Sequence, residues 1–247
     1  MSPGVPGVVE LANEVVVVVL TRAPGTGGKS RLFGALQIEP DPDLLRALLL
    51  DTLAGTAVPG VRRAVAFTPP SADAEMAALL PPDVVRLPQV DGDLGMRMRA
   101  VFEACLGAGA AGVILIGSDL PTLPAASVEA ARDTVRTNDG VVLGPALDGG
   151  YFLIGATATP DALFSIGDWG APDVLDRTLD RAHLEEMAVT LLPPCADVDH
   201  PDDLWVVMGE SARAPRTAAW VRAFIARQRE HVLRLAPDPL DDEISLL

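Results

Sequence analysis

Apolar residues in this chain form short runs that alternate with helical patterns and with clusters of turn-forming residues. The most apolar run, Val15 to Val19, is β-branched throughout, which is typical of a strand buried on both faces. Runs of this kind predict strands at 14–20, 61–67, 84–87, 112–116, 140–143, 151–154 and 188–192. Helical periodicity predicts helices at 30–36, 44–54, 72–80, 94–106, 125–137, 172–183, 201–208 and 216–235, with Asp43 and Asp93 as N-caps.

Strands that alternate with helices of this length predict a mainly parallel sheet covered on both sides, a three-layer α/β/α Rossmann-like fold. We find no internal repeat and no linker long enough to separate two domains. We therefore expect a flexible leader at 1–12, one domain at 13–236 and a flexible acidic tail at 237–247. Ligands bind at the carboxyl ends of strands in such sheets, so the turns after Leu20, Ile116 and Leu143 should share one edge.

The composition excludes several classes of function. A formal charge of −15 argues against nucleic-acid or anionic-membrane binding, because either requires a positive surface. The apolar runs are far shorter than the roughly 20 residues that span a bilayer, and the N-terminus does not resemble a signal peptide. We therefore expect a cytoplasmic protein, whose oligomeric state the sequence does not specify. Cys105 and Cys195 are expected to be free thiols.

A glycine-rich turn with two cations follows the valine strand, in Ala23-Pro-Gly-Thr-Gly-Gly-Lys-Ser-Arg31. Its glycines allow backbone angles at which main-chain N–H groups converge on an anion. Lys29, the only lysine in the chain, and Arg31 add positive charge where a helix should begin. The turn therefore predicts a phosphate site, against the alternative of an ordinary surface turn.

A second alternative for this turn is a P-loop, because residues 23–30 fit a relaxed form of that pattern with Ala23 in place of the first glycine. A P-loop opens a substantial helix at its lysine. Here Pro40 and Pro42 follow within about ten residues, and proline interrupts helices. A P-loop NTPase is therefore the less favoured interpretation.

Two acidic segments suggest a metal site. Asp119 follows a buried strand in Gly-Ser-Asp-Leu-Pro, where a fixed turn suits a ligand of a hard cation such as magnesium. Asp199 lies in Asp197-Val-Asp-His-Pro-Asp-Asp203. Helix capping and turn formation are the alternatives for both acids, and Pro201 would suit the first position of a helix capped by Asp199. A third segment, Asp148-Gly-Gly-Tyr151, is a turn signal that carries the only tyrosine, which could face a ligand.

The order of these motifs resembles that of a bacterial family of nucleotide-diphospho-sugar-transferase-like proteins with the GT-A fold, which includes glycosyltransferase-like domains of unknown function. The resemblance covers residues from about 14 to 206. The matching motifs are Ala23-Pro24 with Lys29-Ser-Arg-Leu32, Gly92-Asp-Leu-Gly95, Gly117-Ser-Asp-Leu-Pro121, Gly144-Pro145 with Asp148-Gly-Gly-Tyr151, Trp169-Gly-Ala-Pro172 and Asp197-Val-Asp-His-Pro201. The Lys-Ser-Arg-Leu core is also similar to that of phospholactate guanylyltransferases, a related group.

The chain departs from the family pattern at three places. The first loop is one residue shorter than usual, Gly170-Ala171 replaces a Ser-Thr pair, and His200 replaces a threonine. The Gly170-Ala171 departure removes two hydroxyls that could bind an acceptor.

The resemblance implies roles for individual residues. Asp119 and Asp199 would hold Mg²⁺ or Mn²⁺ against the nucleotide phosphates. Lys29 and Arg31 would supply catalytic positive charge, and Asp148 would be a candidate general base. The nucleotide-binding positions would be Ala23, Pro24, Gly25, Gly27, Gly28, Lys29, Gly92, Asp93, Gly95 and Ser118. The acceptor-side positions would be Gly149, Gly150, Tyr151 and Trp169.

The resemblance implies a metal-dependent transferase with a nucleotide-activated donor and a small-molecule acceptor. In the leading interpretation it moves a glycosyl group from a nucleotide-diphospho-sugar. In the alternative it joins an NTP to a phosphorylated small molecule, as a guanylyltransferase does. A third interpretation, a non-catalytic nucleotide-binding protein, stays open because of the Gly170-Ala171 departure.

Overall fold

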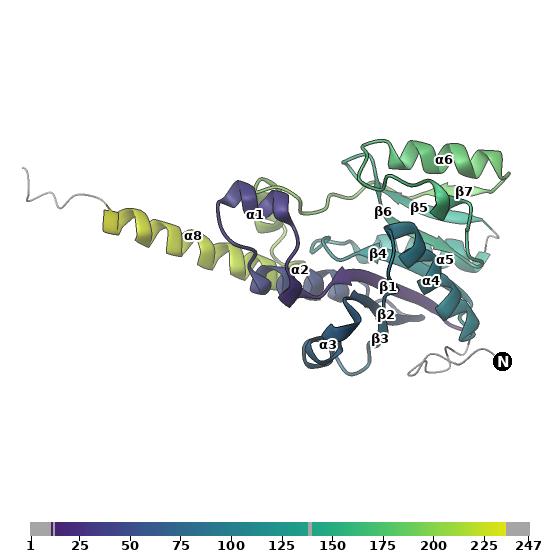
Figure 1. Ribbon diagram of the computed structural model, residues 1–247, viewed down its shortest axis with the longest axis horizontal. Coiled ribbons are helices and arrows are strands. Elements are labelled where there is room, and N and C mark those ends of the chain that lie inside the picture. Colours follow the sequence, from purple (N-terminus) through teal and green to yellow (C-terminus); the bar gives the residue numbers. More distant parts are fainter. Residues whose placement is uncertain (1–10, 12, 138–139, 236–247) are drawn as a thin grey trace, which may run out of the picture.

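A seven-stranded sheet forms the centre of the molecule (Figure 1). The computed structural model describes residue 11 and residues 13–137 and 140–235. Its strands are β1 (Val15–Arg22), β2 (Val61–Thr68), β3 (Val85–Pro88), β4 (Gly112–Gly117), β5 (Val141–Pro145), β6 (Tyr151–Ala156) and β7 (Val189–Leu191). Its α-helices are α1 (Ser30–Leu36), α2 (Pro42–Gly55), α3 (Asp73–Leu79), α4 (Leu94–Gly107), α5 (Ala125–Thr137), α6 (Val174–Leu184), α7 (Asp203–Gly209) and α8 (Pro215–Leu235).

The sheet is mainly parallel, as the alternation of strands and helices predicts. Its strand order is β3-β2-β1-β4-β6-β5-β7, and β6 alone among them runs antiparallel to both of its neighbours. β1 pairs with β2 on one side and β4 on the other, so Val15 lies opposite both Val61 and Gly112. The carboxyl ends of β1, β4 and β5 consequently lie at the same edge of the sheet.

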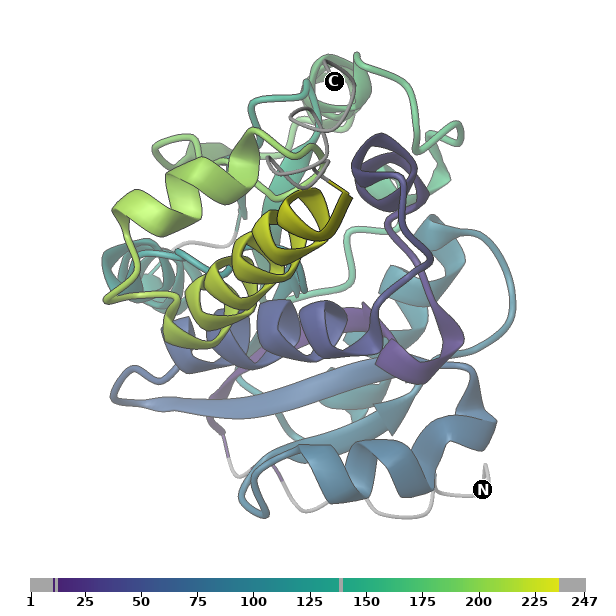
Figure 2. The same cartoon turned by 90° about the vertical axis from the view of Figure 1, so that its left-hand side faces the viewer.

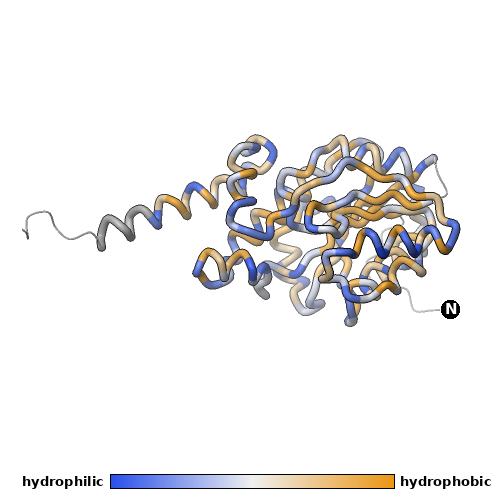
Figure 3. The backbone as a smooth tube through the Cα atoms, turned by 90° about the horizontal axis from the view of Figure 1, so that it is seen from above, coloured by the Kyte–Doolittle hydropathy of each residue, from blue (hydrophilic) through white to orange (hydrophobic). Residues whose placement is uncertain are grey.

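Helices cover both faces of the sheet, which gives the predicted three-layer α/β/α fold. Val15 to Val19 are all fully buried, and their side chains alternate between the two faces. Val16 and Val18 lie in the core cluster that includes residues of α4 and α6, whereas Val15 and Val17 lie in the cluster that includes residues of α5. In the view from above, the hydrophobic strands lie inside a more polar outer layer (Figure 3).

The sequence places every one of these strands and α-helices within two residues of its observed boundaries. One local prediction is wrong. The N-cap of α2 is Asp41 and not Asp43, because Pro42 occupies the first helical turn and the Asp41 carboxylate accepts a hydrogen bond from the Asp43 N–H at 2.8 Å. Asp93 caps α4 as predicted, accepting from the Met96 N–H at 2.8 Å.

Cys105 and Cys195 are free thiols, as predicted, and burial raises the pKa of Cys105 to about 12. Of the predicted leader, Leu11 lies within the described residues and is buried in the core. The predicted acidic tail lies outside the described residues. No helix in the described part of the chain has the length and apolar character needed to cross a membrane.

A buried carboxylate joins α2 to the start of α8, and the two helices lie side by side in Figure 2. The side chain of Asp51 is fully buried and accepts hydrogen bonds from the Thr217 N–H at 2.8 Å and the Thr217 hydroxyl at 2.9 Å. Arg216 completes the set with an ion pair at 3.0 Å. Asp51 therefore stabilises the N-terminus of α8, whose first amides have no partner within the helix.

We expect Asp51→Ala to lower the free energy of unfolding by about 3 kcal/mol, because it leaves Thr217 with buried donors that lack acceptors. Urea unfolding followed by circular dichroism measures this change. Asp43→Ala on the same helix is the control, since that carboxylate is exposed and its pair with Arg46 contributes about 0–1 kcal/mol. Equal effects of the two substitutions would show that Asp51 has no special role.

Candidate functional site

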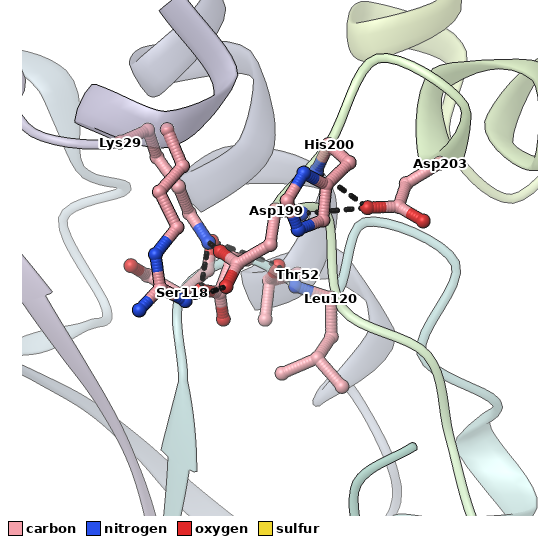
Figure 4. Close-up of polar contacts among 9 residues, drawn as sticks. Lys29, Thr52, Ser118, Leu120, Asp199, His200 and Asp203 are labelled. Carbon is pink, nitrogen blue, oxygen red and sulfur yellow. Dashed lines mark hydrogen bonds and ion pairs between the residues drawn. The ribbon is translucent and has the colours of Figure 1, made fainter. Parts of the chain in front are cut away.

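The turns after β1 and β4 meet at the edge of the sheet where the sequence predicts a ligand site. Lys29 ends the glycine-rich loop after β1 and is the N-cap residue of α1. Asp119 lies in the turn after β4. The Lys29 ammonium group forms ion pairs with both Asp119 and Asp199 (Figure 4). The structure thus joins three residues that the sequence selected separately.

Ion pairing keeps Lys29 charged although it is largely buried. Burial by itself would lower the pKa of this amine, but the attraction of Asp119 and Asp199 outweighs burial and raises its pKa. The other predicted cation, Arg31, is more peripheral. Its guanidinium lies 3.9 Å from the Asp199 carboxylate, and 71% of its side chain is exposed.

Backbone contacts bring the second acidic segment to the first. The Val198 N–H donates to the Asp119 carbonyl at 2.9 Å, which places Asp199 beside the turn that follows β4. The alternative that Asp199 caps a helix is wrong, because α7 begins at Asp203. The Asp203 carboxylate instead accepts from the N–H groups of Asp199, at 2.8 Å, and His200, at 2.6 Å. This arrangement leaves the Asp199 carboxylate available to Lys29.

A threonine from α2 fixes the turn that carries Asp119. The buried Thr52 hydroxyl donates to the Ser118 carbonyl at 3.2 Å and accepts from the Leu120 N–H at 3.1 Å (Figure 4). It thus bonds the backbone on both sides of Asp119. Thr52 is not among the residues predicted from the sequence, since nothing local distinguishes it from other helical threonines.

Three carboxylates gather at this point. Asp119, Asp197 and Asp199 each offer an oxygen atom within 4.8 Å of the others. Burial, followed by repulsion from Asp119 and Asp199, raises the pKa of Asp197 to about 6. Oxygen ligands of this kind suit hard divalent cations, so the cluster can hold a metal ion. Asp197 is not among the metal ligands predicted from the sequence. The Asp-x-Asp spacing contains a signal for it, because alternate residues of an extended segment face the same side.

A cavity of about 190 Å³ opens on one side of this cluster, and one of about 180 Å³ opens on the other. We call the smaller one the cationic cavity, because Arg22 and Lys29 line it together with Gly27, Gly28 and Ser118. The larger one we call the aromatic cavity, because Tyr151, Phe152 and Trp169 line it. Asp119 lines both cavities and so lies at their boundary.

The glycine-rich loop has fewer free backbone donors than the sequence suggests. The Gly25 N–H donates to the Glu75 carboxylate at 2.8 Å. Thr26 and Gly27 donate their N–H groups to carbonyls within the loop. Side chains, chiefly Lys29, therefore supply the positive charge of this loop. The structure gives the P-loop alternative no support, since α1 ends at Leu36 as predicted and three loop amides already have acceptors.

The other nucleotide-binding positions predicted from the resemblance are not among the described residues that line either cavity. Ala23 and Pro24 are buried beneath the loop. Gly92 and Asp93 precede α4 and Gly95 lies in its first turn, while their neighbour Leu94 lines the aromatic cavity.

Two glycines shape the aromatic cavity by allowing close backbone contact. A Cβ atom on Gly95 would lie 2.1 Å from the Phe164 carbonyl oxygen, so only glycine lets α4 approach the segment before Trp169. A Cβ atom on Gly149 would lie 1.8 Å from the Pro172 carbonyl oxygen, and this glycine has a φ of +91°. The two predicted acceptor-side turns therefore pack directly against each other.

Asp148 and Gly150 line the same cavity. The exposed Asp148 carboxylate accepts the Gly150 N–H at 3.0 Å, which fixes its direction. Of the four predicted acceptor-side residues, Gly150, Tyr151 and Trp169 line this cavity. Gly149 lies beside it, between Asp148 and Gly150.

Comparisons with known proteins agree with this architecture. A family model described as "Uncharacterized protein conserved in bacteria (DUF2064)" matches residues 51–171. The chain is 34% identical over 148 residues to a 3-phospho-D-glycerate guanylyltransferase from Phenylobacterium zucineum (strain HLK1). That alignment covers 57% of this chain and 66% of the relative, slightly less than two thirds of its length.

Solved structures extend the likeness to most of the chain. A provisionally named nucleotide-diphospho-sugar transferase from Desulfovibrio desulfuricans G20 is 27% identical, with a TM-score of 0.77 over 88% of this chain and 98% of that one. A CMP:2-keto-3-deoxy-manno-octonic acid synthetase, solved with CTP, is 15% identical, with a TM-score of 0.53 over 81% of this chain and 99% of that one. The family resemblance and the GT-A-type fold read from the motifs are confirmed. The fold is that of nucleotidyltransferases and nucleotide-diphospho-sugar transferases.

We expect Thr52→Val to lower the free energy of unfolding by about 1–3 kcal/mol, because it leaves the buried Leu120 N–H without an acceptor. The matched control is Thr56→Val, at the buried C-cap residue of α2, whose hydroxyl donates to the Leu53 carbonyl at 2.7 Å. That carbonyl keeps the Thr56 N–H as a partner, so the control should cost less. Urea unfolding compares the two, and a larger loss in the control would contradict the assigned role of Thr52.

Proposed function

We propose that this chain is a metal-dependent nucleotidyltransferase that joins an NTP to a phosphorylated small molecule. The observation that carries the proposal is the buried Lys29 ammonium group, held by Asp119 and Asp199 at the boundary of two cavities. Arg22 and Lys29 line the cationic cavity, which suits the triphosphate of a donor. The guanylyltransferase relative supports the same reaction.

Asp119, Asp197 and Asp199 would hold the metal, as Mg²⁺ or Mn²⁺. A bound cation of this kind offsets phosphate charge and stabilises the leaving pyrophosphate. The donor set fits, since it offers three carboxylates from two segments whose backbones are hydrogen bonded to each other. When phosphates enter, Lys29 can exchange a carboxylate for a phosphate oxygen without losing its charge partner.

In nucleotidyl transfer, an oxygen of the acceptor phosphate attacks the α-phosphorus of the NTP, and the bond to the β-phosphate breaks to release pyrophosphate. The attacking oxygen is already an anion, so the reaction requires no general base. Lys29 would neutralise the charge that develops between donor and acceptor, with Arg22 and Arg31 farther out.

Glycosyl transfer is the second candidate, and two observations favour it. The structural relative of TM-score 0.77 is named for nucleotide-diphospho-sugars. Asp148 also lines the aromatic cavity, where it would be the base that a hydroxyl acceptor requires. In that reaction the donor phosphates leave as a nucleoside diphosphate.

We expect Asp119→Ala to abolish magnesium-dependent nucleotide binding while the protein stays folded, because the variant loses the acid shared by both cavities. Thermal-shift titrations of NTPs with and without Mg²⁺ measure this loss. Asp83→Ala is the control, since Asp83 is exposed and precedes β3, at the opposite edge of the sheet. An unchanged magnesium-dependent shift in Asp119→Ala would remove Asp119 from the site.

The released product distinguishes the two reactions. With an NTP and a panel of phosphate esters, we expect pyrophosphate in amounts equal to the new nucleotide conjugate, measured by coupled assay and mass spectrometry. Release of a nucleoside diphosphate from a nucleotide-sugar, with no pyrophosphate from any NTP, would select glycosyl transfer instead.

A further inference from the structure

The aromatic cavity differs in charge from the cationic cavity beside it. Its lining includes the carboxylates of Asp119, Asp148 and Asp197 and, among the residues that the structure describes, no lysine, arginine or histidine. Arg22 and Lys29, the two basic residues that line these cavities in the described part of the chain, both line the cationic cavity. A ligand that enters the aromatic cavity therefore meets negative charge without a compensating cation from the cavity wall.

Two basic residues near this cavity, Arg177 and Lys29, already have partners. Arg177 contacts the loop before Trp169, but its Nη1 and Nη2 atoms donate to the carbonyls of residues 166–168, at 2.7 to 3.3 Å. Its Nε atom donates to the Asp173 carboxylate at 3.0 Å. Lys29, at the boundary, already faces Asp119 and Asp199. With these partners, neither Arg177 nor Lys29 is directed at an anion in the aromatic cavity.

Asp148 is the acid in this lining that stands apart from the metal cluster. A divalent metal held by Asp119, Asp197 and Asp199 would, together with Lys29, offset those three charges. The Asp148 carboxylate, in contrast, has the Gly150 N–H as its hydrogen-bond donor and no ion pair among the described residues. Its charge would therefore persist in the loaded site. It would repel a second anionic group on an acceptor whose phosphate lies at the metal.

The aromatic side chains line this cavity without adding charge to its wall. Tyr151 has its hydroxyl 3.9 Å from the Met98 sulfur, a weak acceptor. The Trp169 indole N–H is buried without a partner in the described part of the chain. Faces and edges of aromatic rings also pack well against carbon-bound hydrogens or an ammonium group.

We infer that the acceptor is a phosphate monoester whose far end carries no negative charge, being hydroxylated or cationic, and that Asp148 determines this specificity. The inference rests on the proposed nucleotidyl transfer, because that reaction places the acceptor phosphate at the metal and its far end in the aromatic cavity. It separates this chain from an enzyme that takes 3-phosphoglycerate, whose far end is a carboxylate.

The test compares three small phosphate esters that differ at the far end. Glycerol 3-phosphate ends in a hydroxymethyl group, phosphoethanolamine in an ammonium group and 3-phosphoglycerate in a carboxylate. Calorimetric titration into the full chain with Mg²⁺ and a non-hydrolysable NTP analogue gives the three dissociation constants. We expect 3-phosphoglycerate to bind about tenfold more weakly than glycerol 3-phosphate, as for one uncompensated like charge at close range.

Two variants isolate the side chain. Asp148→Asn should remove most of the difference between glycerol 3-phosphate and 3-phosphoglycerate, and Asp148→Lys should reverse it. Asp83→Asn, at the opposite edge of the sheet, removes the same charge from the protein and should leave the difference unchanged. Equal changes in Asp148→Asn and Asp83→Asn would overturn the role of Asp148.

The outcomes separate this inference from the proposed function. Tighter or equal binding of 3-phosphoglycerate to the wild-type protein would overturn the inference and leave nucleotidyl transfer intact. Nucleotide binding with no measurable affinity for any of the three esters would overturn the phosphate-monoester acceptor. Failure of the NTP analogue itself to bind with Mg²⁺ would overturn the proposed function.

Discussion

The arrangement of this site depends on one cation placed between two carboxylates. Asp119 and Asp199 lie on segments far apart in the sequence, but their half-buried carboxylates have oxygen atoms within 4.8 Å of each other. Without a positive partner, these two groups would repel each other. Lys29 supplies that partner, and its amine stays charged because ion pairing outweighs burial. A buried charge without a partner is strongly destabilising, so the ion pairs of Lys29 stabilise the loop after β1 and both acidic turns in their present arrangement.

Residues outside the carboxylate cluster hold these acids in place through hydrogen bonds to their backbone. Thr52 bonds the backbone on both sides of Asp119, and Asp203 holds the N–H groups at Asp199 and His200. The helix that carries Thr52 is in turn bonded to α8 through Asp51. The turns that carry the carboxylates are therefore held by hydrogen bonds to their backbone, most of which are at least partly buried and costly to break. Such preorganisation is what a metal site requires.

The two cavities divide the tasks of a transferase. Phosphate-rich donors need fixed positive charge, which Arg22 and Lys29 provide on one side of Asp119. An acceptor needs shape and selective contacts, which the aromatic rings and Asp148 provide on the other. Because the metal cluster lies between them, donor and acceptor would meet where the cation offsets the most charge. The same fold can support glycosyl or nucleotidyl transfer, since function depends on the groups that line these cavities.

The strands, the helices, the parallel sheet and the edge where the site lies can all be predicted from the amino-acid sequence. Local periodicity and turn residues carry that information, and the sheet topology converts strand ends into neighbours. The pairing of polar atoms, in contrast, depends on tertiary contacts. In the structure, Asp41 is the N-cap of α2 and Asp199 caps no helix. Asp197 joins the carboxylate cluster, and the Glu75 carboxylate accepts the Gly25 N–H. Glu75 lies 50 residues from Gly25, and Asp119 lies about 80 residues from Asp197, and pairings of that kind depend on packing that no local pattern encodes.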